Sequence, residues 1–190
     1  MRKIRLNKYR IIEIILVIII IISLLFILLP ILPRLFYNVE HFTVKRNVDQ
    51  TKILESEKIP DSRRLVIPLI DVDSQIVEGD EVGVLDSQEG VWLQAGQVGT
   101  TSVVIAGHRF KYLPPNRTTL YNLDKLKEDD LIAIYWDGQK YIYAVKSQYE
   151  VSKDDISILN PTDDNALIIY TCVDDSLQKR LVVKALPAKN

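Results

Sequence analysis

The sequence predicts a mainly β domain behind one N-terminal transmembrane helix. From Leu65 onward, short apolar or alternating runs are separated by turn residues, and about 125 residues hold seven or eight candidate strands. So many short strands usually close into a barrel or pack as a sandwich, because closure removes exposed strand edges. A long uninterrupted apolar stretch near the N-terminus predicts the helix.

The apolar stretch runs from Ile14 to Leu32 and reads IILVIIIIISLLFILLPIL. Its nineteen residues match the roughly 20 that a helix needs to cross the bilayer core. Among the first ten residues after it only Arg34 is strongly basic, whereas five basic residues precede it, which predicts a cytoplasmic N-terminus. A cleaved signal peptide is the alternative, but the stretch exceeds the usual h-region and no small-x-small cleavage site follows it. The preceding basic residues are Arg2, Lys3, Arg5, Lys8 and Arg10.

The chain therefore divides into four predicted segments. Residues 1–10 form a cytoplasmic basic tail and residues 11–32 a signal anchor that crosses the cell membrane once. Residues 33–63 are a polar juxtamembrane stalk, and residues 64–190 form one extracytoplasmic β domain. The net charge of −1 gives no basic excess, which argues against nucleic acid as a partner.

The candidate strands are bounded by turn residues. Asp137-Gly138 lies between two β-rich arms and predicts a two-residue hairpin. The stretches EVGVLDSQEGVWLQAG and TTLYNLDKL are less regular, and each has room for a short helix or turn. In chain order the strand-like runs are RLVIPLI, SQIVEG, TSVVIAGH, DLIAIYWDGQKYIYAVKSQYEV, NALIIYTC and KRLVVKAL.

The only cysteine of the chain, Cys172, ends one of these runs. Outside the cytoplasm thiols normally pair as disulfides, and Cys172 has no intramolecular partner, which favours a reactive thiol over a buried small hydrophobe. His108 ends the run TSVVIAGH and is a candidate acid/base partner. Arg180 follows Cys172 at the start of the last run and can donate to an oxyanion. The second histidine, His41, is interpreted as a solvated stalk residue.

On these residues the chain resembles the sortases, membrane-anchored cysteine transpeptidases of bacterial cell surfaces. In sequence order, the family's His, Thr-Cys and Arg fall on His108, Thr171-Cys172 and Arg180. Two departures concern turns: Asp129-Asp130 stands where many relatives have Gly-Asp, and Thr101-Ser102 where Gly-Asn is usual. The resemblance covers about Leu65 to Leu186, through RLVIPLIDVDSQIVEG, GQVGTTSVVIAGHR, LYNLDKLKEDDLIAIYWDGQKYIYAV, LIIYTC and KRLVVKA.

The resemblance implies an eight-stranded sortase-type β-barrel with short helices. In such an enzyme Cys172 attacks the Thr–Gly bond of an LPxTG-like sorting signal on a surface protein, which gives a thioacyl enzyme. An amine acceptor, such as a peptidoglycan precursor or a pilin lysine, then resolves it. The expected roles are acid/base catalysis for His108, oxyanion stabilisation for Arg180 and substrate binding for Thr171.

The chemistry implied by the resemblance requires no metal and no cofactor. Acidic residues at 128–130 and 154–155 are possible calcium ligands, as in some relatives, but exposed turn carboxylates are the favoured interpretation. The stalk lacks the Asp-Pro-aromatic lid motif of pilus-building relatives, which favours a class D- or E-like enzyme. Two other functions stay open: a thiol hydrolase or peptidase that uses water as acceptor, and a non-catalytic membrane-tethered binding domain with Cys172 in its core.

Overall fold

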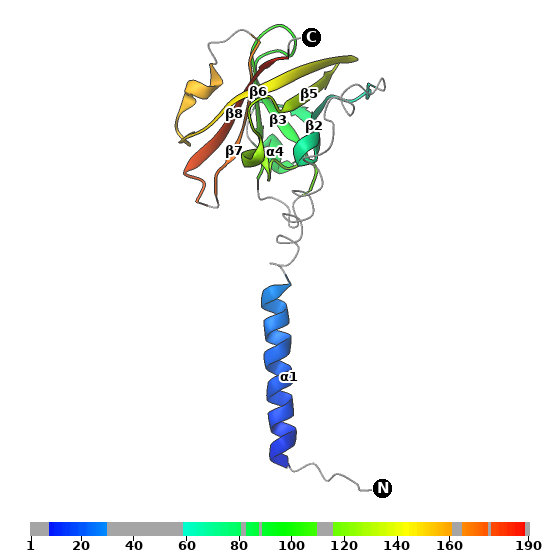
Figure 1. The fold of residues 1–190 in the computed structure, drawn as a ribbon, viewed down its shortest axis with the longest axis vertical. Helices are drawn as coiled ribbons and strands as arrows, with labels where there is room; N and C mark the ends of the chain where they lie inside the picture. The colour runs from blue at the N-terminus through cyan, green and yellow to red at the C-terminus, as the bar shows by residue number, and fades with distance from the viewer. Residues whose placement is uncertain are drawn as a thin grey trace.

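The structure contains one N-terminal apolar helix, α1 (Lys8–Leu28), and a separate β domain (Figure 1). From Tyr9 to Leu28 the helix has a mean hydropathy of 3.5 and is long and apolar enough to cross a membrane. The predicted anchor extends to Leu32, but residues 30–32 lie outside the described part of the chain, as do His41 and most of the stalk. The division into four segments therefore stays a prediction. The computed structural model describes residues 8–29, 59–80, 83–87, 89–109, 116–160, 165–174 and 176–188.

Eight strands form the β domain and close into a barrel in the order β1-β2-β3-β4-β7-β8-β6-β5. The predicted mainly β, eight-stranded barrel is confirmed. Two neighbouring pairs, β2–β3 and β4–β7, are parallel, and the remaining pairs are antiparallel. The strands are β1 (Arg64–Ile67), β2 (Val72–Glu78), β3 (Val91–Ala95), β4 (Val103–Gly107), β5 (Leu131–Trp136), β6 (Gln139–Ser152), β7 (Leu167–Cys172) and β8 (Lys179–Pro187).

Among the described residues, four short helices lie between the strands: η1 (Pro68–Ile70), α4 (Val84–Ser87), η2 (Leu123–Lys125) and η3 (Ile156–Leu159). Helices α4 and η2 fall in the two stretches where a short helix or turn is expected. The run RLVIPLI is a strand only as far as Ile67, because Pro68 has no N–H to donate to a ladder and begins η1 instead. The sequence patterns missed β3, whose residues VWLQA follow α4 in the irregular stretch.

The hairpin predicted at Asp137-Gly138 joins β5 to β6. Asp137 has φ 48° and Gly138 has φ 74°, and two central residues of positive φ are the signature of a type I′ turn. Strand β6 is long enough to pair with β5 along its first half and with β8 along most of its length. Strand β5 in turn pairs with β1, which closes the barrel.

Both departures from the family's turn residues have a local explanation. Asp129 has φ 70°, the left-handed region that glycine adopts freely and that aspartate tolerates better than most residues. The hydroxyl of Thr101 accepts from the backbone N of Gln97 at 2.8 Å, and the hydroxyl of Ser102 accepts from the backbone N of Ala166 at 3.0 Å. Side-chain hydrogen bonds therefore hold the connection that leads into β4.

The barrel interior is apolar because alternate residues of each strand point inward. On β7, Leu167 and Ile169 are fully buried in the interior cluster, whereas Ile168 and Tyr170 belong to clusters on the outer face. Helix η3 covers part of this outer face through Ile158, and α4 covers another part through Leu85. Tyr170 packs against both outer clusters and so lies between the two helices.

Topology decides where the strand ends meet. Because β4 and β7 are parallel neighbours, their carboxyl ends lie at the same end of the barrel. Their register pairs Val103 with Leu167 and continues to Ala106 with Tyr170. Strand β8 returns antiparallel to β7. Residues that are far apart in sequence are thereby brought to one end of the barrel.

Candidate active site

Cys172 is the last residue of β7 and has a free, half-buried thiol. The strand alternation puts Cys172 on the outer face, the face on which Tyr170 lies two residues earlier. Arg180, the second residue of β8, is the direct cross-strand partner of Cys172. Residues directly opposite each other on antiparallel strands have Cβ atoms about 4.5–5.5 Å apart, so the guanidinium and the thiol share one face.

His108 directly follows β4, which is the parallel neighbour of the strand that ends at Cys172. When the β4–β7 register is continued by two residues beyond Ala106↔Tyr170, His108 stands opposite Cys172. Its side chain is 34% exposed. The ring Nε2 lies 3.3 Å from the carbonyl O of Leu85 and 3.7 Å from a carboxylate O of Asp86, both on α4. A carbonyl oxygen only accepts, so this contact is a hydrogen bond when Nε2 carries a proton.

Arg180 is oriented by the backbone of the β7–β8 connection. Its Nη1 donates to the carbonyl O of Leu177 at 2.9 Å and lies 3.3 Å from the carbonyl O of Lys179. Leu177 has φ 59°, a left-handed backbone conformation that is uncommon for a residue other than glycine. The adjacent Lys179 instead pairs with Glu150 on β6 at 3.0 Å. The two neighbouring cations thus have different partners.

Thr171 points away from this face. Its side chain is 2% exposed, and its hydroxyl donates to the carbonyl O of Gly107 at 2.7 Å. This bond joins the ends of β7 and β4 next to Cys172 and His108. Substrate binding by Thr171 stays a prediction, and its bond to Gly107 is a contact within the barrel.

Tyr170 and Gln94, which lie on the same outer face as Cys172, were not anticipated from the sequence. The hydroxyl of Tyr170 donates to the side-chain carbonyl of Gln94, a residue of β3. Burial raises the pKa of Tyr170, while the nearby positive charge of Arg180 acts in the opposite direction. A neutral phenol therefore lies beside the thiol. Tyr170 could have been found from its spacing of two residues from Cys172, which puts both on one strand face.

A third unanticipated residue is Arg109, the neighbour of His108. Its side chain is only 13% exposed. Its guanidinium donates to the carbonyl O of Val173 at 2.7 Å and forms an ion pair with Asp124 at 2.8 Å. The histidine loop is thereby attached to the residue that follows Cys172.

Three of the five acidic residues considered for calcium, Glu128, Asp130 and Asp155, make side-chain contacts within the protein. Glu128 pairs with Lys146, and this hydrogen bond lowers the pKa of Glu128. Asp130 accepts from the backbone N of Lys127 at 2.6 Å, and Asp155 accepts from the backbone N of Ser157 at 2.9 Å at the start of η3. In the part of the chain that the structure describes, no three His, Cys, Asp or Glu side chains gather as metal ligands do.

A pocket of about 290 Å³ lies away from these residues. It is lined by Lys140, Tyr141 and Asn165, among others. Asn165 precedes β7, so the pocket lies at the end of the barrel opposite Cys172. The candidate site is located instead by the strand ends that carry His108, Cys172 and Arg180.

Fold and site together define a class: closed β-barrel proteins that carry a cysteine, a histidine and an arginine at one end of the barrel. Comparison with known families identifies the family more narrowly. The family model described as Sortase domain matches residues 65–188. The chain belongs to the sortase family, whose members are cysteine transpeptidases. A search of curated proteins returns no significant match.

Solved structures of sortases share this fold. Sortase A of Listeria monocytogenes is 20% identical, with a TM-score of 0.59, and the match covers 68% of this chain and 89% of that one. Sortase D5 transpeptidase of Clostridium perfringens is 28% identical, with a TM-score of 0.57 and coverage of 79% and 95%. Sortase E1 of Streptomyces coelicolor is 19% identical, with a TM-score of 0.59 and coverage of 68% and 88%. The barrel is thus similar to those of several sortase classes.

Proposed function

We propose that the protein is a sortase that cleaves an LPxTG-like sorting signal between Thr and Gly and transfers the cleaved protein to an amine. The observation that carries this proposal is the strand register: Cys172 stands opposite Arg180, and the continued β4–β7 register sets His108 on the other side of the thiol. Membership of the sortase family supplies the reaction class.

In the first half-reaction the Cys172 thiolate attacks the carbonyl carbon of the signal's threonine. A C–S bond forms, and the carbonyl oxygen becomes an oxyanion that accepts hydrogen bonds from Arg180. His108 as imidazolium donates a proton to the glycine nitrogen, the C–N bond breaks and the amine leaves. The product is a thioester between Cys172 and the surface protein.

In the second half-reaction an amine attacks the thioester carbonyl. His108, now neutral, accepts the proton that the amine loses, and the Cys172 thiolate leaves. The new amide joins the surface protein to a cell-wall precursor or to a pilin lysine. Neither half-reaction calls for a metal or another cofactor.

The contacts of Arg180 are compatible with oxyanion stabilisation. A guanidinium carries five N–H donors in a planar fork, and both recorded bonds, to Leu177 and Lys179, come from Nη1. The backbone can therefore hold one arm of the fork while another donates to the substrate. Thr171 serves this site indirectly in our proposal, by fastening the end of β7 to β4.

The test compares transfer with hydrolysis. The full chain in detergent is incubated with a sorting-signal peptide, with and without a glycine-based amine. Transfer predicts a peptide–amine conjugate that increases with amine concentration. If cleavage occurs only with water as the acceptor, the protein is a thiol hydrolase. If no peptide is cleaved and native Cys172 resists alkylation, the protein is a binding domain.

The class and location of the enzyme are part of the same proposal. The 28% identity to the Clostridium perfringens Sortase D5 transpeptidase exceeds the identities to sortases A and E1 above, which supports a class D-like enzyme. Helix α1 anchors the chain in the cell membrane with its N-terminus in the cytoplasm and the barrel outside. Protease added to intact, wall-stripped cells should degrade the barrel, and full protection of the barrel would show the opposite topology.

A further inference from the structure

Arg109 is a largely buried arginine that has partners around the end of β7 and on the connection to η2. Besides Val173 and Asp124, its Nε donates to the carbonyl O of Tyr121 at 3.2 Å, and its Nη1 lies 3.4 Å from the carbonyl O of Cys172. A buried charge is tolerated only when it is paired and hydrogen-bonded, and Arg109 meets both conditions. The side chain is thus held in one orientation.

The contacts of Arg109 lie just beyond the end of the backbone pairing between β4 and β7. The β4–β7 register ends at Ala106↔Tyr170, and β4 itself ends at Gly107. Past that point, the hydroxyl of Thr171 donates to the carbonyl O of Gly107, and the guanidinium of Arg109 donates to the carbonyl O of Val173. Two side chains, one from each strand end, therefore continue the ladder in place of backbone bonds.

We propose that Arg109 is a positioning residue that keeps the thiol-bearing end of β7 in register with His108. Arg109 adjoins His108 in sequence and bonds across to the residues at and after Cys172. Loss of the guanidinium frees the end of β7 beyond Thr171 and lets the thiol and imidazole separate. The expected effect on the reaction rate rests on the proposed function. The positioning of Cys172 by Arg109 does not depend on it.

The geometry requires an arginine rather than any cation. The fork reaches three acceptors on different segments: a carbonyl after β7, the Tyr121 carbonyl and the Asp124 carboxylate. Lysine preserves the charge but lacks the planar fork. A substitution by lysine should therefore restore only part of the function, which distinguishes hydrogen-bond positioning from a charge effect.

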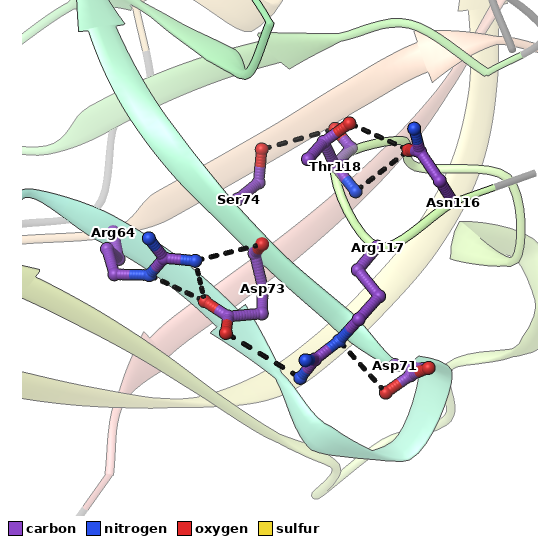
Figure 2. A network of polar contacts seen from close by, with 7 residues as sticks. All are labelled: Arg64, Asp71, Asp73, Ser74, Asn116, Arg117 and Thr118. Carbon is purple, nitrogen blue, oxygen red and sulfur yellow. Dashed lines mark hydrogen bonds and ion pairs between the residues drawn. The ribbon is translucent and has the colours of Figure 1, made fainter.

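Arg117 provides a matched control on the same connection. Its side chain is 61% exposed and forms ion pairs with Asp71 and Asp73, at the beginning of β2 (Figure 2). The loop is also attached to β2 by the backbone N of Asp73, which donates to the carbonyl O of Arg117 at 2.9 Å. Arg117→Met removes an arginine from this connection while leaving the contacts of Arg109 in place.

The experiment uses the full chain in detergent and a fluorogenic LPxTG-like peptide. Arg109→Met, Arg109→Lys, Arg117→Met, His108→Ala and the double variant His108→Ala/Arg109→Met are compared for kcat, KM and thermal unfolding. The rate of Cys172 alkylation by iodoacetamide is measured in the same variants without peptide. Asp124→Ala, which removes one anchor of the guanidinium, carries the test if Arg109→Met does not fold.

We expect Arg109→Met to lower kcat by about 10–100-fold and to change KM by less than about threefold, because a displacement of about 1 Å can cost this much in rate. Arg109→Lys should recover only part of the loss, and Arg117→Met should stay within about twofold of wild type. In the His108→Ala background, Arg109→Met should cost less than about threefold more, since both changes disrupt one unit.

The proposal is wrong if folded Arg109→Met, or folded Asp124→Ala in its place, retains wild-type kcat. It is also wrong if the loss lies in KM alone, if lysine restores full activity, or if the losses multiply in the double variant. Failure of wild type to cleave the peptide contradicts the proposed function instead. In that case the alkylation rate decides: we expect Arg109→Met to change it at least about threefold, and a wild-type rate would overturn the inference.

Discussion

At the scale of single residues, three nitrogen-bearing side chains near Cys172 contact backbone carbonyls. His108 contacts the carbonyl O of Leu85, Arg180 donates to that of Leu177, and Arg109 donates to that of Val173. Backbone carbonyls are fixed by the fold, so the donors are oriented before substrate binds. Preorganisation of this kind is what makes charge stabilisation effective in an active site.

Arg180→Ala should lower the rate of Cys172 acylation by about 10²–10³-fold, the range observed when one oxyanion-hole donor is removed. Arg180→Lys should rescue only part of this loss because lysine lacks directed, forked donors. Single-turnover acylation with a sorting-signal peptide measures both effects. The protein should stay folded, since the side chain is partly exposed and its recorded bonds are to nearby carbonyls.

Lys179→Ala is the matched control for Arg180. Lys179 adjoins Arg180 but pairs with Glu150, and successive strand residues point to opposite faces. Its removal should leave acylation within about twofold of wild type, as surface substitutions usually have small effects. Near-normal acylation in Arg180→Ala, or a larger loss in Lys179→Ala, would show that Arg180 is not the cation that stabilises the oxyanion.

At the scale of elements, two short helices cover the outer face on either side of Tyr170. Helix α4 packs through Leu85, which is 4% exposed, against Trp92 and Ala106. Helix η3 packs through Ile158 over a different cluster. Helix α4 also contacts His108, through the carbonyl O of Leu85 and the carboxylate of Asp86. The two helices should therefore affect the site differently.

Leu85→Ala should destabilise the fold by about 2–5 kcal/mol, as truncations of buried leucines do. It should also lower the acylation rate, because α4 then no longer holds the His108 ring. Ile158→Ala should destabilise the fold by a similar amount. Its acylation rate should fall less than that of Leu85→Ala at the same loss of stability. Urea unfolding and single-turnover acylation of both variants test this difference, and equal rate losses at equal destabilisation would contradict it.

The residues at the strand ends that form the site were predictable from the sequence. The contacts that orient their side chains were not. Cys172 and His108 were identifiable because each ends an apolar run, and Arg180 because it begins one. The contacts of Arg109 depend on β4 and β7 being parallel neighbours, and this pairing joins segments more than 60 residues apart. No local pattern encodes such a pairing.

Strand β3 shows the same limit within the fold. Its five residues, VWLQA, contain a break in register between Leu93 and Ala95, so the alternation that identifies a strand is lost. The strand forms because it pairs with β2 on one side and β4 on the other. Tertiary pairing therefore overrides a weak local signal. The hairpin at Asp137-Gly138 was predictable because its turn chemistry is local.

At the scale of the whole molecule, several tyrosines are shielded from water, with Tyr143 in the interior of the barrel and Tyr170 on its outer face. Burial is the largest cause that raises the pKa of Tyr135, Tyr143 and Tyr170 above its ordinary value near 10. The unfolded chain then loses phenolic protons at lower pH than the folded chain does. The stability contributed by these neutral phenols is present below about pH 10 and is lost as the pH rises beyond it.

Tyr143→Phe tests this dependence because Tyr143 is 3% exposed and its substitution removes one such phenol. The free energy of unfolding of the full chain in detergent is measured by urea titration at pH 8 and pH 11. The wild-type chain should lose more stability between the two pH values than the variant does. An equal or larger loss in Tyr143→Phe would mean that buried tyrosine ionisation does not control alkaline stability.

The central claim is that Cys172 forms a covalent thioester with a sorting signal, and intact-protein mass spectrometry tests it most directly. The full chain is mixed with an LPxTG-like peptide, quenched in acid and analysed by mass, with Cys172→Ala as the control. The account predicts an added mass equal to the peptide fragment through threonine, located on Cys172, released by an added amine and absent from Cys172→Ala. Peptide cleavage without this adduct, or cleavage by Cys172→Ala, would contradict the account.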